Sequence, residues 1–168
     1  MTSPYRVGDE LPPLEIPVTR TLIVAGAIAS RDYQDVHHDA ASAREKGSPD
    51  IFMNILTTNG LVGRYITDHF GPTAVLRKVA IRLGAPNYPG DVLRLTGRIT
   101  ELRAADGPSA GAGGAADAGK TADAGNAAET GRAIEAVVQV TGGNGIGRHV
   151  TGTVAVTLPE PTAGRTGA

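Results

Sequence analysis

Two side chains of opposite acid–base character, Asp32 and His37, lie five positions apart in a polar stretch of the chain. A carboxylate and an imidazole can together take a proton from water and deliver one to carbon, because imidazole titrates near neutral pH. Adding water to a C=C bond conjugated to a thioester needs such a pair, and also a donor that holds the enolate oxygen. The N-terminus of a buried helix provides that donor through its free backbone N–H groups. The loop must fold back, since a fully extended chain would hold the two residues roughly 17 Å apart.

The elements that must position this pair lie on both sides of it. Residues 22–30 are apolar and rich in alanine, and they predict a short buried helix; the polar loop that follows enters a small helix at 40–45. Apolar side chains at spacings of three and four then predict a long, largely buried helix over 50–70. Gly71 and Pro72 supply its stop signal.

The second half of the chain changes to a period of two, which is typical of strands. Strands are predicted at 75–83, 92–102, 134–140 and 149–158. The Asn144-Gly145 pair between the last two indicates a hairpin, and a shorter strand at 14–19 precedes the first helix. One long helix beside a run of antiparallel strands predicts an α+β fold, and this pattern by itself does not distinguish one α+β fold from another.

One domain accounts for most of the chain. We assign residues 1–13 to an N-terminal arm, because two successive prolines there block regular strand pairing. Residues 14–160 form the domain, and residues 161–168 form a disordered tail. The Ala- and Gly-rich insertion at 104–133 has too few large apolar side chains to offset the entropy of ordering, so we predict a flexible loop that joins two strands.

Composition excludes several classes of function. The 168 residues carry a formal net charge of -1 with scattered Lys and Arg, which argues against a nucleic-acid surface. Cysteine is absent, which excludes thiolate nucleophiles, disulfides and cysteine-based metal sites. No apolar run approaches the roughly 20 residues that span a bilayer, and the acidic, proline-rich start is unlike a signal peptide. We therefore expect a cytoplasmic protein that binds neither nucleic acid nor membrane.

The polar neighbours of the pair are expected to have other roles. His38 would point away from His37 in an extended segment, so we place it at the surface or at an interface. Asp35 and Asp39 are expected to form hydrogen bonds within the loop. A metal ion held by His37, His38 and Asp39 is not expected, because adjacent ligands rarely converge and the sequence offers no obvious fourth ligand.

The run Asp32-x-x-x-x-His37, with Val36 at its aliphatic position, resembles the hydratase motif of the MaoC-like proteins, usually written Asp-x-Asn-Pro-(Ile/Val/Leu)-His. The turn at 86–91 resembles the Pro-x-x-x-Gly-Asp turn of the same fold. The resemblance covers most of the predicted domain outside the Ala- and Gly-rich insertion. It implies a single hotdog fold, in which an antiparallel sheet wraps around one long central helix, and it implies that Asp32 and His37 are the catalytic acid–base pair.

Longer runs are similar to one branch of these proteins. The runs are ASRDYQDVHHD at 29–39, DIFMNILT at 50–57 and GLV at 60–62. They resemble the small MaoC-like subunit of the actinobacterial steroid side-chain enoyl-CoA hydratases. This resemblance implies a CoA thioester of a steroid as substrate, with no cofactor beyond that CoA. It also implies a larger partner subunit with a MaoC-like domain and a DUF35 domain, in a heterodimer or heterotetramer, which brings in an aldolase.

The chain departs from the general motif at several positions. Gln34-Asp35 replaces Asn-Pro, Arg31 replaces the usual glycine, and Met53-Asn54 replaces His-Gly at the start of the central helix. The backbone N–H groups of Asn54 and Ile55 are the candidate donors to the thioester oxygen, although the Asn54 side chain narrows the approach. These departures argue against straight-chain substrates.

Two other functions stay open. Hotdog thioesterases often carry a carboxylate on the central helix, yet residues 53–67 contain no Asp or Glu; release of free CoA would identify that activity. The chain would be a non-catalytic acyl-CoA-binding or scaffolding subunit if a partner held the whole acid–base pair. Mixing mutant and wild-type subunits would distinguish that case.

Overall fold

The structure is a computed structural model that describes residues 4–105 and 133–159. The predicted flexible insertion at 104–133 is too long by its two end residues, because Ala104 and Ala133 pair with other strands of the sheet. The rest of it, apart from residue 105, and the predicted tail at 161–168 lie outside the described residues. Within the described part of the chain, no helix is long and apolar enough to cross a membrane.

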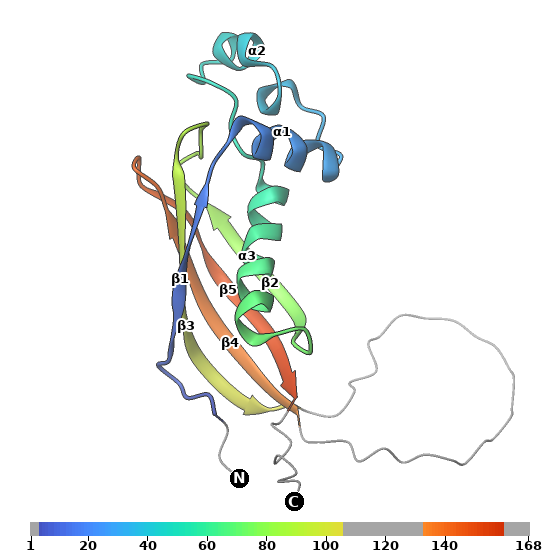
Figure 1. The fold of residues 1–168 in the computed structure, drawn as a ribbon, viewed down its shortest axis with the longest axis vertical. Coiled ribbons are helices and arrows are strands. Elements are labelled where there is room, and N and C mark those ends of the chain that lie inside the picture. The colour runs from blue at the N-terminus through green and yellow to red at the C-terminus, as the bar shows by residue number, and fades with distance from the viewer. Residues whose placement is uncertain (1–3, 106–132, 160–168) are drawn as a thin grey trace, which may run out of the picture.

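An antiparallel sheet of five strands wraps around one long helix (Figure 1). In chain order the elements are β1 (Glu10–Pro17), α1 (Arg20–Ala29), the 3-10 turn η1 (Asp35–His37), α2 (Ala40–Glu45), α3 (Ile55–Phe70), β2 (Val75–Leu83), β3 (Val92–Ala104), β4 (Ala133–Gly143) and β5 (Arg148–Pro159). The strand order β1-β3-β4-β5-β2 leaves β1 and β2 at the edges. Helix α3 lies along one face of the sheet, and α1 and α2 gather beyond its N-terminal end. The predicted α+β layout is confirmed.

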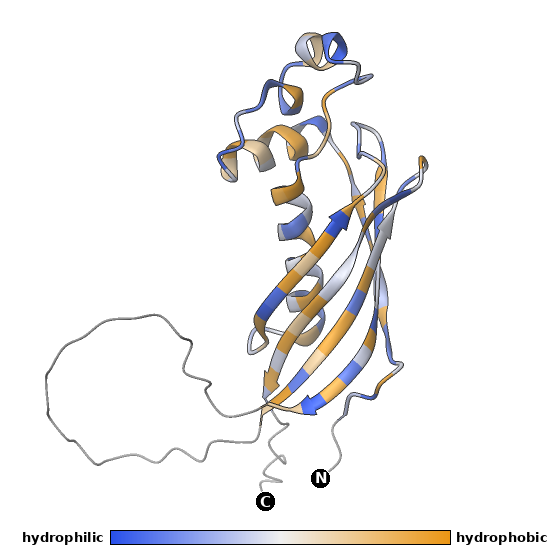
Figure 2. Cartoon of the chain, turned by 180° about the vertical axis from the view of Figure 1, so that it is seen from behind, coloured by the Kyte–Doolittle hydropathy of each residue, from blue (hydrophilic) through white to orange (hydrophobic). Residues whose placement is uncertain are grey.

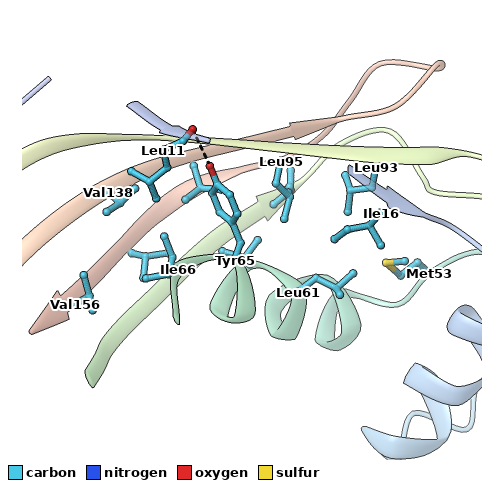
Figure 3. Packing of buried hydrophobic residues seen from close by; sticks show 14 of the residues in the cluster. Leu11, Ile16, Met53, Leu61, Tyr65, Ile66, Leu93, Leu95, Val138 and Val156 are labelled. Atoms are coloured by element: carbon cyan, nitrogen blue, oxygen red, sulfur yellow. Dashed lines mark hydrogen bonds between the residues drawn. The ribbon is translucent and has the colours of Figure 1, made fainter. Parts of the chain in front are cut away.

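The core forms where the apolar faces of the strands meet the apolar stripe of α3. Figure 2 shows hydrophobic and hydrophilic residues alternating along the strands. On β3 the side chains of Leu93, Leu95 and Ile99 are buried, while those of Arg94, Thr96 and Arg98 are exposed. The buried side chains of α3 include Val62 and Phe70. They also include Leu61, Tyr65 and Ile66, which Figure 3 shows among the strand residues. Burial of each large apolar side chain stabilises the fold by about 1.5–3 kcal/mol.

The first strand begins earlier than predicted. β1 starts at Glu10, so residues 10–13 belong to the sheet and not to an arm. The register with β3 shifts between Leu11 and Leu14, and this irregularity accommodates the two prolines on an edge strand. The hydroxyl of Tyr65 donates to the carbonyl oxygen of Pro12 at 3.0 Å, so a core side chain on α3 holds the irregular segment in place.

The central helix begins later than predicted. Residues 50–54 are not helical, because their backbone groups pair with other segments. The N–H of Phe52 donates to the carbonyl of Val36 at 3.2 Å, and the N–H of Met53 donates to the carbonyl of Asn87 at 3.0 Å. These bonds bring the acid–base loop and the 86–91 turn to the start of α3.

Candidate active site

The end of helix α1 delivers Asp32 to the site. Ser30 caps the helix, and Arg31 follows it with a positive φ of 57°. The N–H of Asp32 then donates to the carbonyl oxygen of Ala27 at 2.9 Å, and the N–H of Arg31 donates to the carbonyl oxygen of Ile28 at 3.0 Å. Both bonds are those of a Schellman motif, which reverses the chain after a helix. Arg31 is the one described non-glycine residue with positive φ, and it stands where the general motif has glycine.

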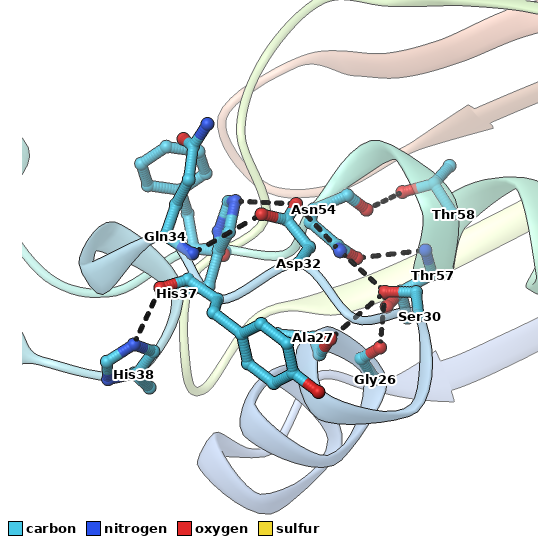
Figure 4. A network of polar contacts seen from close by, with 12 residues as sticks. Gly26, Ala27, Ser30, Asp32, Gln34, His37, His38, Asn54, Thr57 and Thr58 are labelled. Carbon is cyan, nitrogen blue, oxygen red and sulfur yellow. Dashed lines mark hydrogen bonds and ion pairs between the residues drawn. The ribbon is translucent and has the colours of Figure 1, made fainter.

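Asp32 and His37 converge, as the acid–base hypothesis requires. The chain turns again through η1, and Nε2 of His37 lies 3.3 Å from Oδ2 of Asp32 (Figure 4). His37 is buried, with 5% of its surface exposed. The predicted folding back of the loop is confirmed, and the two groups can act on one small molecule between or beside them.

The backbone sets which nitrogen of His37 carries the proton. Nδ1 lies 2.7 Å from the carbonyl oxygen of Phe52. A carbonyl oxygen can only accept a hydrogen bond, so Nδ1–H is the donor and Nε2 of the neutral ring has a free lone pair. The ring of Phe52 also packs edge-on against the imidazole, with centroids 5.0 Å apart. His37 therefore presents a proton-exchanging nitrogen to the Asp32 carboxylate in a fixed orientation.

The side chain of Asn54 connects the carboxylate to helix α3. Its Nδ2 donates to Oδ2 of Asp32 at 3.0 Å and to Oγ of Ser30 at 2.9 Å (Figure 4). Its Oδ1 accepts the backbone N–H of Thr57 at 2.9 Å, which makes Asn54 the N-cap of α3. One side chain therefore starts the central helix and orients the candidate base.

The same contacts favour the ionised form of Asp32. The hydrogen bond from Asn54 holds the pKa of the Asp32 carboxyl below its ordinary value, although partial burial acts to raise it. The backbone N–H of Gln34 and the nearby His37 lower this pKa further. A carboxylate that stays ionised is suited to orient and deprotonate water.

The predicted thioester-binding residues lie at the same place. Asn54 and Ile55 line the pocket onto which Asp32 and His37 open. Ile55 is the first residue of α3, so its backbone N–H has no acceptor within the helix. This N–H is available to an oxygen at the positive end of the helix dipole.

The pocket has a cavity volume of about 360 Å³, within the usual range for small-molecule sites. Its walls come from the acid–base loop, from residues 52–55 before and at the start of α3, and from residues 83–86 at the end of β2. His149 of β5 lines the remaining side. The pair therefore faces a half-open pocket formed by four separate parts of the chain.

The other loop residues have the roles expected of them. His38 is exposed, with Nε2 3.3 Å from the carbonyl oxygen of Tyr33. Asp39 caps α2 by accepting N–H groups of its first turn. A hydrogen bond from Lys46 lowers the pKa of Asp35 to about 2, with help from the hydroxyl of Ser42 in α2. Among the residues that the structure describes, no group of three His, Asp or Glu side chains could hold a metal ion.

Two features of the pocket are not predicted from the sequence. The prediction for Asn54 concerned its backbone, whereas its side chain contacts Asp32; the available signal was that asparagine is a favoured N-cap. His149 is buried and has both ring nitrogens in hydrogen bonds, but no acidic neighbour in the sequence marks it as a site residue.

No protein-family model matches the chain. The chain is 38% identical over 154 residues to the beta subunit of 3-oxo-4,17-pregnadiene-20-carboxyl-CoA hydratase from Mycobacterium tuberculosis, which covers 92% of this chain and 97% of that subunit. A chain in the crystal structure of the ChsH1-ChsH2 complex from the same organism superposes with a TM-score of 0.70 at 38% identity, covering 91% of this chain and 98% of that one.

More distant structures share the fold. The (R)-hydratase of A. caviae involved in PHA biosynthesis superposes with a TM-score of 0.70 at 17% identity, over 94% of this chain and all of the other (100%). The MaoC-like dehydratase of Rhodospirillum rubrum gives 0.69 at 16% identity, over 95% of this chain and 96% of the other. These matches confirm the predicted hotdog fold. Together with the 38% identity over nearly the whole length, they show that the chain belongs to the MaoC-like hydratase family, in the group that includes the mycobacterial beta subunit.

Proposed function

We propose that this chain is the catalytic subunit of an enoyl-CoA hydratase that adds water across the 2-enoyl double bond of a steroid CoA thioester. The observation that carries the proposal is the approach of His37 Nε2 to Asp32 Oδ2, 3.3 Å apart in a pocket at the start of α3. The substrate class is supported by the relative named for 3-oxo-4,17-pregnadiene-20-carboxyl-CoA.

The proposed reaction uses side chains and backbone groups of this chain. Asp32 orients a water molecule and takes its proton, and the resulting hydroxide adds to the β-carbon of the substrate. The backbone N–H groups of Asn54 and Ile55 hold the thioester oxygen as negative charge develops there. The proton passes between the facing groups of Asp32 and His37 and is returned to the α-carbon, so both residues end in their starting state.

No cofactor enters this scheme, because proton transfer and oxyanion binding are its steps and CoA arrives as part of the substrate. Neither rival function is favoured. The described carboxylate on α3 is Asp68, which is exposed near the far end and paired with Arg64, so a thioesterase carboxylate has no counterpart beside the pocket. A purely scaffolding role is disfavoured because Asp32 and His37 both lie on this chain.

We also propose a larger partner subunit with a MaoC-like domain and a DUF35 domain, in a heterodimer or heterotetramer, through which an aldolase is recruited. Two features support a protein partner. The edge strand β2 exposes Val75 and Leu76, and α3 exposes Ile55 and Leu56. Unpaired strand edges and exposed apolar side chains are typical of surfaces that another protein covers.

The decisive experiment measures hydration by the chain in complex with the partner that co-purifies with it. Asp32→Ala and His37→Ala should each lower kcat by at least about 100-fold, since each removes a proton-transfer group. His38→Ala is the matched control and should keep the wild-type rate, because His38 is exposed and directed to Tyr33. Mass spectrometry should show the substrate gaining one water. A folded Asp32→Ala complex with near wild-type rate would refute the proposal, and release of free CoA would indicate a thioesterase.

A further inference from the structure

A buried histidine outside the acid–base pair forms a second polar feature of the pocket. His149 on β5 is 1% exposed and lines the cavity. Its Nδ1 lies 2.6 Å from the carbonyl oxygen of Ala85, and its Nε2 lies 2.9 Å from Oγ1 of Thr58. Neither ring nitrogen is left to exchange a proton with a ligand, so His149 differs in kind from His37.

These contacts determine the state of the ring. The Ala85 carbonyl can only accept, so Nδ1–H donates to it, and in the neutral ring Nε2 accepts the hydroxyl proton of Thr58. Burial lowers the pKa of His149, while the Ala85 carbonyl and the charge of Asp91 act to raise it. The lowered pKa of His149 and its hydrogen-bond pattern both indicate a neutral imidazole with its proton on Nδ1.

The ring links two walls of the pocket. Thr58 is fully buried in the first turn of α3, and its hydroxyl also lies 3.4 Å from the carbonyl oxygen of Asn54 (Figure 4). On the other side, Ala85 belongs to the segment that follows β2, and the N–H of Gly84 donates to the carbonyl of His149 at 2.8 Å. The imidazole thus spans from the start of the central helix to the opposite wall.

An apolar side chain would be the simpler occupant of this position. The residues of β5 that follow and face the core are all apolar, namely Val150, Val154, Val156 and Leu158. Net stabilisation from a buried hydrogen bond is modest, about 0.5–1.5 kcal/mol, whereas its geometry is specific. A histidine with both nitrogens bonded therefore contributes mainly a fixed distance and angle between the two walls.

We propose that His149 is a positioning residue for the hydratase reaction. It holds the 83–86 wall and the first turn of α3 at a fixed separation, so that a thioester oxygen meets the N–H groups of Asn54 and Ile55 while the double bond faces the acid–base pair. The inference rests on the proposed function and adds to it a residue that touches neither the reacting carbon atoms nor the water.

A matched pair of variants at Thr58 tests the link in the full complex. Thr58→Val keeps the shape of the side chain but removes the hydroxyl, and it should lower kcat by about tenfold with little change in KM, because the loss is in transition-state alignment. Thr58→Ser keeps the hydroxyl and should restore kcat. Thr96→Val removes an exposed hydroxyl from the outer face of the sheet and controls for the chemical change alone.

A second variant acts from the other side of the link. His149→Asn keeps an N–H that can reach the Ala85 carbonyl but has no group at the position of Nε2. This variant should lower kcat as Thr58→Val does. The double variant Thr58→Val/His149→Asn should lower kcat no further than either single variant, because each change breaks the same hydrogen-bonded link. Thermal unfolding of each complex shows whether the fold is kept.

Nitrogen NMR of the imidazole provides a readout that does not depend on activity. His149 should show a proton on Nδ1 and none on Nε2, and it should stay neutral below the ordinary histidine pKa of about 6.5. Thr58→Val should shift the Nε2 resonance, and Thr58→Ser should restore it.

The outcomes separate the two proposals. A wild-type complex that does not hydrate the substrate would refute the proposed function, and the positioning role with it. An active wild type whose Thr58→Val and His149→Asn variants keep full kcat, or change KM alone, would overturn only the role of His149. A proton found on Nε2 of His149 would overturn it as well.

Discussion

Nδ2 of Asn54 lies 3.0 Å from Oδ2 of Asp32, so the residue that caps the central helix also holds the candidate base. The helix and the acid–base loop are far apart in sequence, and this bond ties them at the point where the substrate would react. The hydrogen bond also lowers the pKa of Asp32, which links the start of α3 to the pH range of activity.

Asn54→Ser should shift the acid limb of kcat/KM to higher pH. Serine can still cap α3, but its shorter side chain does not reach Asp32, so the pKa of that carboxyl should rise. Asn54→Ala loses the cap as well, and its free energy of unfolding should fall by about 1 kcal/mol. Rate–pH profiles and urea unfolding measure the two effects. An unshifted acid limb in Asn54→Ser would show that Asn54 does not hold the carboxylate.

The pH dependence of stability has a defined sign. The folded-state pKa of Asp32 lies below its unfolded value, so the ionised carboxylate contributes stability above the ordinary aspartate pKa of about 3.9. That contribution is lost as the pH falls through the folded-state pKa. Asn54→Ser should therefore lose less stability than wild type between neutral pH and acid, and unfolding curves across this range measure the difference.

Arg31→Gly should leave the free energy of unfolding within about 0.5 kcal/mol of wild type. Glycine relieves the left-handed backbone at this position, and its greater entropy in the unfolded chain offsets the gain. Arg31→Val should lower the free energy of unfolding by about 1–2 kcal/mol, because a β-branched side chain fits a backbone with positive φ poorly. Arg31→Ala controls for loss of the long side chain. Equal stability of Arg31→Val and Arg31→Ala in urea unfolding would contradict this account.

Gly152→Ala should destabilise the sheet by more than about 2 kcal/mol. A Cβ at this position would lie 2.2 Å from the carbonyl oxygen of Ala80 and 2.8 Å from Cα of Ile81, so the backbone of β2 would have to move. Gly145→Ala is the matched control, since a Cβ there meets nothing within 4 Å. Thermal unfolding compares the two variants, and equal midpoints would show that β2 can shift at little cost.

Leu56→Asp should weaken association with the partner subunit at least tenfold while leaving the isolated chain folded. The side chain is 48% exposed on α3, and a charge buried at an apolar interface costs more than a kcal/mol. Ile146→Asp is the control, because Ile146 is 56% exposed in the turn between β4 and β5. Light scattering of the co-purified complex reports the assembly. An intact complex with Leu56→Asp would remove this face of α3 from the interface.

Local periodicity was enough to predict most of the elements. Spacings of three, four and two record which side chains face the core, so β2 is found at its predicted bounds. The match to the hydratase motif selected Asp32 and His37 before any geometry was known. The largest errors in element bounds fall at 10–13 and 50–54, where the backbone pairs with distant segments that the local sequence pattern does not reveal.

Only the tertiary structure decided what the selected residues can do. The approach of Asp32 to His37 depends on a Schellman turn at Arg31, a residue type that does not predict it. The hydrogen bond from Asn54 to Asp32 joins residues 22 positions apart in the sequence. The hydrogen bond between Thr58 and His149 joins residues 91 positions apart. Such contacts arise from how α3 packs against the sheet and against the loop after α1, whereas a sequence pattern records only which residues are buried.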